Sequence, residues 1–572
     1  MTPTHPSRTH HPIRFVFQTF ACIFVLILSA ATKAQTAPDP ASGHILLVLP
    51  FDNLTPTPAT SQTNGQANID WIREAAPEIL NSRFTSAGFL SLTREDRLYA
   101  LDHLGLPETF QPSRATALRI AETLDANYIV IGSYSESGAT LTLKARIVDV
   151  AKLRLSEEIT QSGDIVQLIP LLNSLAWRIT RKLDPSFSVG EETFKAAGSR
   201  IRLDAFEQYV RGLTEHDTDE RLRHLKKATD LSPDFTEAWL ATAKLQFANQ
   251  QYEQAAVSFG KVIHPVNGLD STELEAGFYR GLSLIFSGSY PKAEDAFASV
   301  ARVLPLPEVV NNEAVAASRR GHDAVALFRQ ATAADPTDAD YHFNLAVSLH
   351  RHGDKAEALT ELAQALRLHP NDSEAKATLE TWNTADSASS EPLERIKRSF
   401  NGAAFRQAAL MMDQVEAARL AALPSPERAA KLSKSAHDKL DRGLLLESER
   451  GYQAAIAADD HSSEAHAGLA QVRERAGDSE TARKEARAAL DRGPNPQTGL
   501  DAWLVMARVD LAANRLPEAR DEAAEALKLD ASNRAAKDLR RTIDARIEAR
   551  PTSGNKANDT KPPTPNTSAT RQ

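Results

Sequence analysis

The sequence contains a single cysteine, Cys22, among its 572 residues. This count excludes a disulfide framework, a four-cysteine zinc site and CxxC redox chemistry. Aromatic residues are also scarce, at 6%. Alanine is abundant in the second half of the chain, which favours close helix packing over a large β-sandwich. A positive charge excess is missing too, since 66 Lys and Arg face 75 Asp and Glu, a net charge of −9. Nucleic acid is therefore not expected as a partner.

The common motifs of catalytic and cofactor sites are missing as well. The sequence has no GxGxxG, GxxxxGK[ST], GxSxG or HExxH pattern. The glycine-containing stretch 132–138 leads into a strand pattern, so it predicts a hairpin and lacks the helix N-terminus of a phosphate loop. His461 and His466 lie near Asp459 and Asp460, but their spacing meets no rule for zinc. We expect no catalysis, no cofactor and no metal ion.

The segment 1–34 is expected to be a signal peptide. A positively charged start precedes a nearly continuous apolar run over 15–28 and small residues up to Ala34. Cleavage after Ala34, or after Ala31, predicts an exported protein of the periplasm or envelope. The alternative is an inner-membrane anchor formed by residues 15–31, because an apolar run of this length lies at the short end of what spans a bilayer.

Residues 42–190 are expected to form an α+β domain. The apolar run at 44–51 predicts a buried strand. Residues 140–150 alternate apolar and polar side chains after a tight turn, which predicts a half-solvated antiparallel strand. Further strands are expected near 89–93, 128–134 and 153–160, and helices over 69–87, 114–125 and 164–183. Their order predicts a mixed sheet with helices laid on one face.

Residues 203–545 repeat a pattern of small and large side chains. One copy contains Gly281, Gly288, Ala293, Phe297 and Pro305, and another contains Ala346, Gly353, Ala358, Leu362 and Pro370, with a shortened copy ending at Pro336 between them. A period of about 34 residues is typical of stacked helix pairs. The small residues let two helices approach, glycine opens the turn, and proline ends the second helix. This pattern predicts an all-α superhelical solenoid with two arrays, 203–383 and 433–545. An irregular helical joint over 384–432 is expected between them, and a disordered tail over 551–572.

Two resemblances to known families follow from these residues. The repeated pattern of small residue, glycine, alanine, large residue and proline resembles the tetratricopeptide repeat (TPR). The segments LLVLPFDNLTP, LNSRF and LDANYIVIGSYSESGATLTLKARIVDVAKLRL are similar to the amino-terminal domain of the TolB and CsgG/FlgO-like group. Bacterial chains of that group often place this domain before tetratricopeptide repeats, which implies a bacterial, exported protein. The chain departs from the group in its long polar insert at 56–68.

A repeat array of this kind binds other molecules, because its stacked helices line a concave groove. We expect the groove of the first array to bind an extended or helical segment of a partner protein. Its expected lining consists of Leu240, Lys244, Phe247, Phe278, Leu282, Ile285, Phe343, Val347 and His350. The alternative is that tight superhelical curvature or the N-terminal domain buries these side chains, so that they are not open to a partner. A clamp for a C-terminal carboxylate is not expected, since only Asn344 stands near the required positions.

The expected function is a non-catalytic scaffold or adaptor of the bacterial envelope, with a protein or peptide as partner. Two alternatives stay open. In one, the chain is a membrane-anchored sensor whose N-terminal domain binds a small ligand near the loop 56–68 and whose repeats relay the signal. In the other, it is an enzyme with a site unlike the motifs tested.

Overall fold

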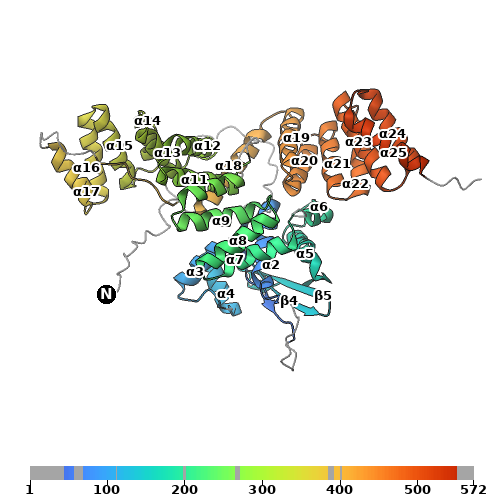
Figure 1. Ribbon diagram of the computed structural model, residues 1–572, viewed down its shortest axis with the longest axis horizontal. Coiled ribbons are helices and arrows are strands. Elements are labelled where there is room, and N and C mark those ends of the chain that lie inside the picture. The colour runs from blue at the N-terminus through green and yellow to red at the C-terminus, as the bar shows by residue number, and fades with distance from the viewer. Residues whose placement is uncertain are drawn as a thin grey trace, which may run out of the picture.

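The structure is a computed structural model, which describes residues 44–56, 68–110, 112–197, 201–264, 271–383, 392–399 and 402–549. The expected signal peptide, nearly all of the polar insert and the expected tail lie outside the described residues. An N-terminal mixed sheet precedes a long series of helices, as predicted (Figure 1). No helix within the described ranges is long and apolar enough to cross a membrane.

The N-terminal sheet has the strand order β3-β1-β4-β5-β6. Its strands are β1 (Ile45–Val48), β2 (Asp52–Asn53), β3 (Leu90–Ser91), β4 (Tyr128–Ser137), β5 (Thr140–Asp149), β6 (Arg154–Leu155) and β7 (Ile159–Asp164). Strands β3, β1 and β4 are parallel, and β2 also pairs with β4 in parallel. Strand β5 returns antiparallel to β4, with Ser137 opposite Thr140, and then pairs antiparallel with β6 and β7. The sheet is therefore mixed.

Helices cover both faces of this sheet, so the prediction of helices on one face is wrong. Leu46 and Val48 share an apolar cluster with α2 (Ile72–Ala87) and α5 (Leu168–Leu183). The alternate residues Leu47 and Leu49 share another cluster with α3 (Arg94–His103) and α4 (Arg114–Thr123). A strand buried on both faces has a continuous apolar sequence, as β1 does. Two helices were predicted between the second and third strands, but only 114–125 was given a range; α3, the other, buries only three of its ten residues.

Gly132 of β4 lies against the ring of Phe51, which is fully buried. A Cβ atom at residue 132 would lie 2.3 Å from that ring. We expect Gly132→Val to lower the free energy of unfolding of the N-terminal region by about 1–3 kcal/mol, because the packed ring has little room to move. Denaturant unfolding measures the change. The matched variant Ser135→Ala, on the same strand, should unfold like the wild type, and equal stability of Gly132→Val would contradict this packing.

The remaining helices form two arrays. Array 1 comprises α7 (Leu203–Thr214), α8 (Thr218–Leu231), α9 (Thr236–Ala248), α10 (Tyr252–Val262), α11 (Ser271–Phe286), α12 (Tyr290–Ala301), α13 (Pro307–Arg319), α14 (Val325–Ala334), α15 (Ala339–His352), α16 (Lys355–Leu368) and α17 (Ser373–Asn383). Array 2 comprises α19 (Ser425–Asp441), α20 (Leu445–Ala458), α21 (Ser463–Arg475), α22 (Ser479–Asp491), α23 (Pro496–Ala512), α24 (Leu516–Leu529) and α25 (Arg534–Glu548). They extend in opposite directions above the N-terminal sheet (Figure 1).

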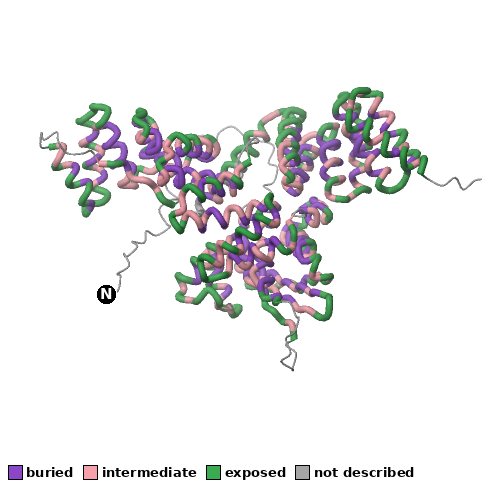
Figure 2. The backbone as a smooth tube through the Cα atoms, in the orientation of Figure 1, coloured by how far each residue is buried: buried purple, intermediate pink, exposed green. Residues whose placement is uncertain are grey.

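Small residues let the paired helices approach, as the repeat pattern predicts. Within one pair, Gly281 of α11 lies against the ring of Phe297 in α12, and between two neighbouring pairs, Gly468 of α21 lies against the ring of Tyr452 in α20. The turns within pairs contain Gly288, Gly353 and Gly477 at positive φ, where glycine is favoured. The buried residues consequently follow the sides on which neighbouring helices face each other (Figure 2).

The joint between the arrays is not helical throughout. Residues 392–399 form neither helix nor strand, although the pattern predicted degenerate helices from 392 onward. Helix α18 (Gly402–Ala421) follows and contacts α11 and α19. Helix α19 already pairs with α20, so array 2 begins at Ser425.

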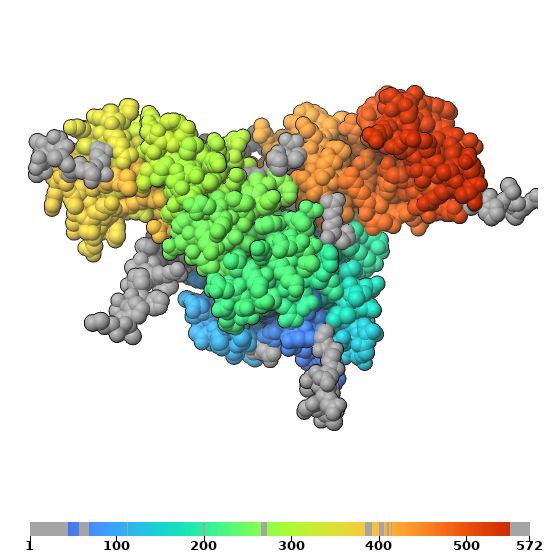
Figure 3. Space-filling model, viewed as in Figure 1, coloured from blue at the N-terminus to red at the C-terminus, as the bar shows by residue number. Residues whose placement is uncertain are grey.

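The N-terminal sheet and the first repeats share one apolar core. Trp71 packs edge-on against Phe206 of α7, with ring centroids 6.2 Å apart. The Tyr209 hydroxyl of α7 donates a hydrogen bond to Glu78 of α2 at 2.9 Å. Leu446 of α20, in array 2, belongs to the same apolar cluster. The N-terminal region therefore packs against both arrays, and the first helices of array 1 lie across the front of this junction in Figure 3.

Array 2 is held to the N-terminal region through Glu449 of α20, whose side chain is completely buried. Its carboxylate accepts hydrogen bonds from the backbone N–H of Gly190 at 3.0 Å and from the hydroxyl of Thr193 in α6 (Glu191–Ala196). Arg473 of α21 pairs with the same carboxylate at 2.7 Å, and Gln453 donates to it at 2.9 Å. A buried charge with these partners fixes the contact between the two parts.

Candidate protein-binding groove

Residues 392–399, the groove segment, lie extended against array 1. Hydrogen bonds and ion pairs reach this segment from α13, from α15 and its N-terminal flank, and from α17 and its N-terminal flank. We call the surface formed by these side chains the array-1 groove. It consists of Asn311, Asn312, Ser318, Arg319, Asp338, Asp340, Phe343, Asn344, Arg351, Asp372 and Glu374.

Two asparagines bind the backbone of the groove segment. The Oδ1 atom of Asn344 accepts from the N–H of Arg395 at 2.6 Å, and its Nδ2 atom donates to the carbonyl of the same residue at 2.7 Å. Asn312 repeats both bonds at Lys397, at 2.9 and 2.8 Å. In an extended chain, residues i and i+2 present their N–H and C=O groups to the same side. These two amides therefore recognise an extended backbone.

The asparagines are fully buried and connected to each other. Asn311 accepts a hydrogen bond from Asn344 at 2.8 Å and donates to the carbonyl of Arg395 at 3.1 Å. It also donates to Asn312 at 3.2 Å. Buried amide groups are costly unless they are hydrogen-bonded. The groove segment supplies several of the bonds that this network needs.

The acidic half of the groove binds the two cationic side chains of the segment. Arg395 donates to Asp340 at 3.0 Å, to Asp372 at 2.6 Å and to Glu374 at 2.9 Å. Its guanidinium group also lies 3.7 Å from the centre of the Phe343 ring, a cation–π contact. The Lys397 ammonium lies 2.7 Å from Asp338 and 2.8 Å from Asp340.

The basic half of the groove binds Glu394, whose side chain is completely buried. Its carboxylate pairs with Arg319 at 3.2 Å and with Arg351, and accepts from the hydroxyl of Ser318. Arg319 and Arg351 also donate to the backbone carbonyls of Glu394 and Pro392, both at 3.0 Å. Acid and base positions in the segment thus face groups of opposite charge.

The groove segment should leave the groove in acid. Burial alone would raise the pKa of Asp340, but Lys397 and Arg395 outweigh it and lower that pKa. Arg395 likewise lowers the pKa of Asp372 against the effect of burial. With the segment docked, both pKa values lie below the ordinary 3.8. In acid the two aspartates therefore bind more protons when the segment is undocked than when it is docked. Docking is then fully favoured above pH 3.8 and weakens as the pH falls through the lowered values.

A spin label on the segment measures this release. Leu393 is 58% exposed, so Leu393→Cys in a Cys22→Ser background gives a single labelling position that leaves the groove contacts intact. We expect an immobile spectrum at neutral pH and a mobile one in acid, before circular dichroism shows loss of helix. The variant Asp340→Asn with Asp372→Asn should be mobile at neutral pH. A label that stays immobile until the helices unfold would contradict the role of the aspartates.

Six of the nine predicted lining residues lie beside residues of the joint or beside the array-1 side chains next to them. Phe343 lies under the guanidinium group of Arg395, and Val347 belongs to the same buried apolar cluster as Phe343. Phe278, Leu282 and Ile285 share one apolar cluster with Phe405 of α18 and Ile396 of the groove segment. The ring of His350 stacks on Trp382 of α17, with centroids 4.1 Å apart. The chain's own joint therefore packs against part of this lining, at Phe343 and in the apolar cluster of Phe278, Leu282 and Ile285.

Of the three other predicted residues, Lys244 and Leu240 lie toward the N-terminal region, whereas Phe247 packs within array 1 against the cluster that contains Phe278. Lys244 pairs with Glu275 at 2.6 Å and with Glu95 of α3 at 3.0 Å. Burial alone would lower the pKa of Lys244, but these carboxylates outweigh it and raise the pKa. Leu240 borders a cleft of about 2810 Å³ between the N-terminal region and the two arrays. Phe247 packs against Tyr252, Tyr279 and Phe286.

Sequence reasoning missed the groove segment and most of its partners. Asn312 and Asn344 are separated by close to one repeat length, so two asparagines in first helices of successive pairs were a usable signal. The acidic residues are also clustered at two helix starts, Asp338 with Asp340 and Asp372 with Glu374. Both features are polar, whereas the search for a groove followed apolar positions.

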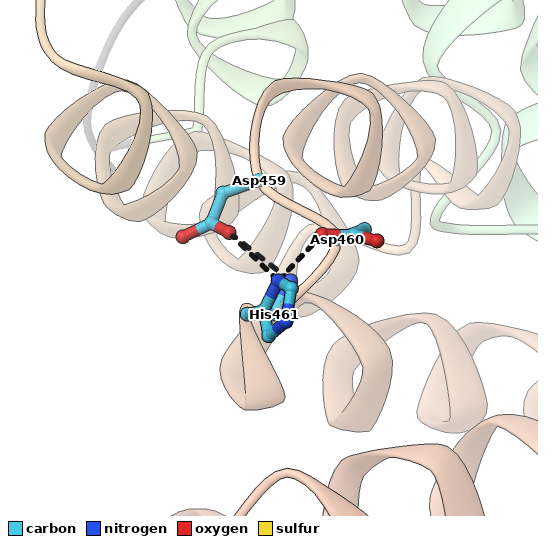
Figure 4. Close-up of side chains that lie close together, drawn as sticks. All are labelled: Asp459, Asp460 and His461. Atoms are coloured by element: carbon cyan, nitrogen blue, oxygen red, sulfur yellow. Dashed lines mark hydrogen bonds and ion pairs between the residues drawn. The ribbon is translucent and has the colours of Figure 1, made fainter.

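The histidines near residue 460 do not form one cluster. Asp459, Asp460 and His461 have ligand atoms within 4.8 Å of one another in the turn before α21 (Figure 4). His461 lies 2.6 Å from Asp460 and 3.9 Å from Asp459, and it is largely exposed. His466 instead bonds Glu485 at 2.7 Å. These exposed side chains pair with each other, and exposed acidic groups of this kind are common without a metal ion.

Residues 312–373 and 434–495 match a family model described as tetratricopeptide repeat. No curated protein sequence matches the chain. Three similar solved structures are YrrB, a TPR protein with an unusual peptide-binding site, the first TPR of Spaghetti (RPAP3) bound to the HSP90 peptide SRMEEVD, and the LpoB C-terminal domain from Salmonella enterica.

YrrB is 16% identical, covers 36% of this chain and 99% of its own, and has a TM-score of 0.27. For the Spaghetti repeat the identity is 18%, the shares are 22% and 96%, and the TM-score is 0.20. The LpoB domain is 20% identical, covers 23% of this chain and 87% of its own, and has a TM-score of 0.18. The family match falls on the observed helix pairs of both arrays, so arrays 1 and 2 each carry tetratricopeptide repeats.

Proposed function

We propose that the chain is a non-catalytic scaffold that binds an extended segment of a partner protein in the array-1 groove. The observation that supports this most is the double hydrogen bond that Asn344 makes with Arg395 and Asn312 makes with Lys397. These bonds engage backbone atoms, which every protein segment offers. The matched repeat region 312–373 includes both asparagines, and stacked helical repeats form extended concave binding surfaces.

We also propose that the chain is exported and acts in the periplasm or at the bacterial envelope. The support is the charged start, the apolar run over 15–28 and the small residues up to Ala34, together with the TolB-like pattern of the N-terminal domain. Mass analysis of the chain purified from bacterial envelopes should give a first residue of Gln35. An intact N-terminus would favour the retained anchor over 15–31.

A peptide titration tests the binding proposal. In an emptied chain, residues 392–399 are replaced by alternating Gly and Ser of the same length. The probe is a fluorescent peptide with the sequence of residues 391–400, EPLERIKRSF. We expect saturable binding to the emptied chain, and binding about 10²- to 10³-fold weaker when Asn312→Ala and Asn344→Ala are added.

The control is Asn249→Ala, an exposed asparagine of array 1 outside the groove. It should leave the affinity unchanged. Circular dichroism verifies that the emptied chain keeps its helices. An emptied chain that is helical but binds no peptide would overturn the proposal.

A further inference from the structure

Resting on the proposed function, we infer that the groove segment is a built-in competitor and that the partner carries its charge sequence. The partner segment is extended, with a carboxylate side chain, then arginine, then, after one further residue, lysine or arginine. This order corresponds to Glu394, Arg395 and Lys397. The partner gains the groove by displacing residues 392–399.

Charge pairing carries the first part of this inference. With the segment gone, Arg319 and Arg351 at one end of the groove lose their shared carboxylate. At the other end, four carboxylates lose two cations. A ligand with no charges would not replace these ion pairs, and one with the opposite order would be repelled on burial. The groove therefore selects the order acid, base, one intervening residue, base.

The exposure of the segment separates selective positions from tolerant ones. The Glu394 side chain is completely buried, whereas Leu393 is 58% exposed. Ile396 is half-buried in an apolar cluster with Phe405, so an apolar residue suits the position between the two bases. Partner segments should consequently vary at the position of Leu393 and conserve the charged positions.

The way the segment is held allows it to exchange. Residues 392–399 belong to no helix or strand, and the groove engages them through side chains of array 1. Their departure breaks none of the backbone hydrogen bonds within α13 or α15. A segment tethered in the same chain has an effective concentration of the order of mM. A free peptide of about 10 µM intrinsic affinity would thus bind the wild-type chain about 100-fold more weakly than an empty groove.

The experiment compares three full-length chains and two peptides. The chains are the wild type, the emptied chain, and Glu394→Lys, which repels Arg319 and Arg351 and releases the segment without deleting it. One peptide has the sequence of residues 391–400, and the other carries Glu394→Lys, Arg395→Glu and Lys397→Glu. We expect the native-sequence peptide to bind the emptied chain and Glu394→Lys about 10-fold or more tighter than the wild type. The swapped peptide should bind the emptied chain about 10-fold or more weaker than the native one.

Each other outcome has one meaning. Equal binding of the native-sequence peptide to the wild type and the emptied chain would overturn the competitor, while the groove would still bind peptides. Equal binding of the two peptides would overturn the charge order. No binding to an emptied chain that keeps its helices would overturn the proposed function itself. A wild-type dimer that needs residues 392–399, seen by light scattering, would place the segment in a second copy and overturn competition within one chain.

Discussion

Replacing both Asn312 and Asn344 with alanine should release residues 392–399 from the array-1 groove. The double variant removes four hydrogen bonds to the backbone of the groove segment. Each is worth about 1 kcal/mol net, so the docking equilibrium should fall by about 10²- to 10³-fold. The ion pairs of Arg395 and Lys397 hold the side chains, but they do not fix an extended backbone.

The spin label at Leu393→Cys reports this release directly. We expect a mobile spectrum for the double variant, intermediate spectra for each single variant, and an immobile spectrum for Asn249→Ala, the exposed control. Helicity measured by circular dichroism should stay unchanged in all of them. An immobile label in the helical double variant would show that the asparagines do not hold the segment.

Removing the Glu449 carboxylate should detach array 2 from the N-terminal region. Glu449→Ala leaves Arg473 without its buried partner and takes an acceptor from Gly190 and Thr193. Breaking a buried ion pair on one side costs about 3–5 kcal/mol. The helices of array 2 stack on each other, so we expect them to stay folded while the contact with α6 opens.

A distance measurement between labels on the two parts detects the opening. Tyr99 on α3 and Leu529 on α24 are both exposed, and cysteine at each, with Cys22→Ser, provides the pair. The narrow distance distribution of the parent chain should broaden in Glu449→Ala. It should stay narrow in Glu480→Gln, an exposed glutamate of α22. An unchanged distribution in Glu449→Ala would mean that the apolar contacts, such as that of Leu446, suffice.

The sequence predicts the repeats well because their signal is local. A small residue such as Gly281 and a ring such as Phe297 lie in neighbouring helices of one pair, and their spacing recurs along the chain. The mixed sheet was also predictable, since strands β4 and β5 are adjacent in sequence. That helices also lie on the second face of the sheet was not predictable, because α3 buries only Arg97, Ala100 and Leu101 and shows a weak apolar pattern.

The groove segment was not predictable by the same means. Residues 392–399 have no apolar period, and their backbone partners Asn344 and Asn312 are 51 and 85 residues away in sequence. The repeat positions that predicted Phe278, Leu282 and Phe343 as groove lining are local, but what lies over these side chains comes from the distant joint. A single sequence does not reveal such a pairing.

Hydrogen exchange at the backbone amides of Arg395 and Lys397 measures whether the array-1 groove holds an extended segment by its backbone. Both amides donate to buried asparagine side chains. In the full chain at neutral pH we predict that they exchange about 10²-fold or more slowly than in the free peptide EPLERIKRSF. This protection should be lost with Asn312→Ala and Asn344→Ala. Exchange in the wild-type chain at the rate of the free peptide would show that the groove does not hold this backbone.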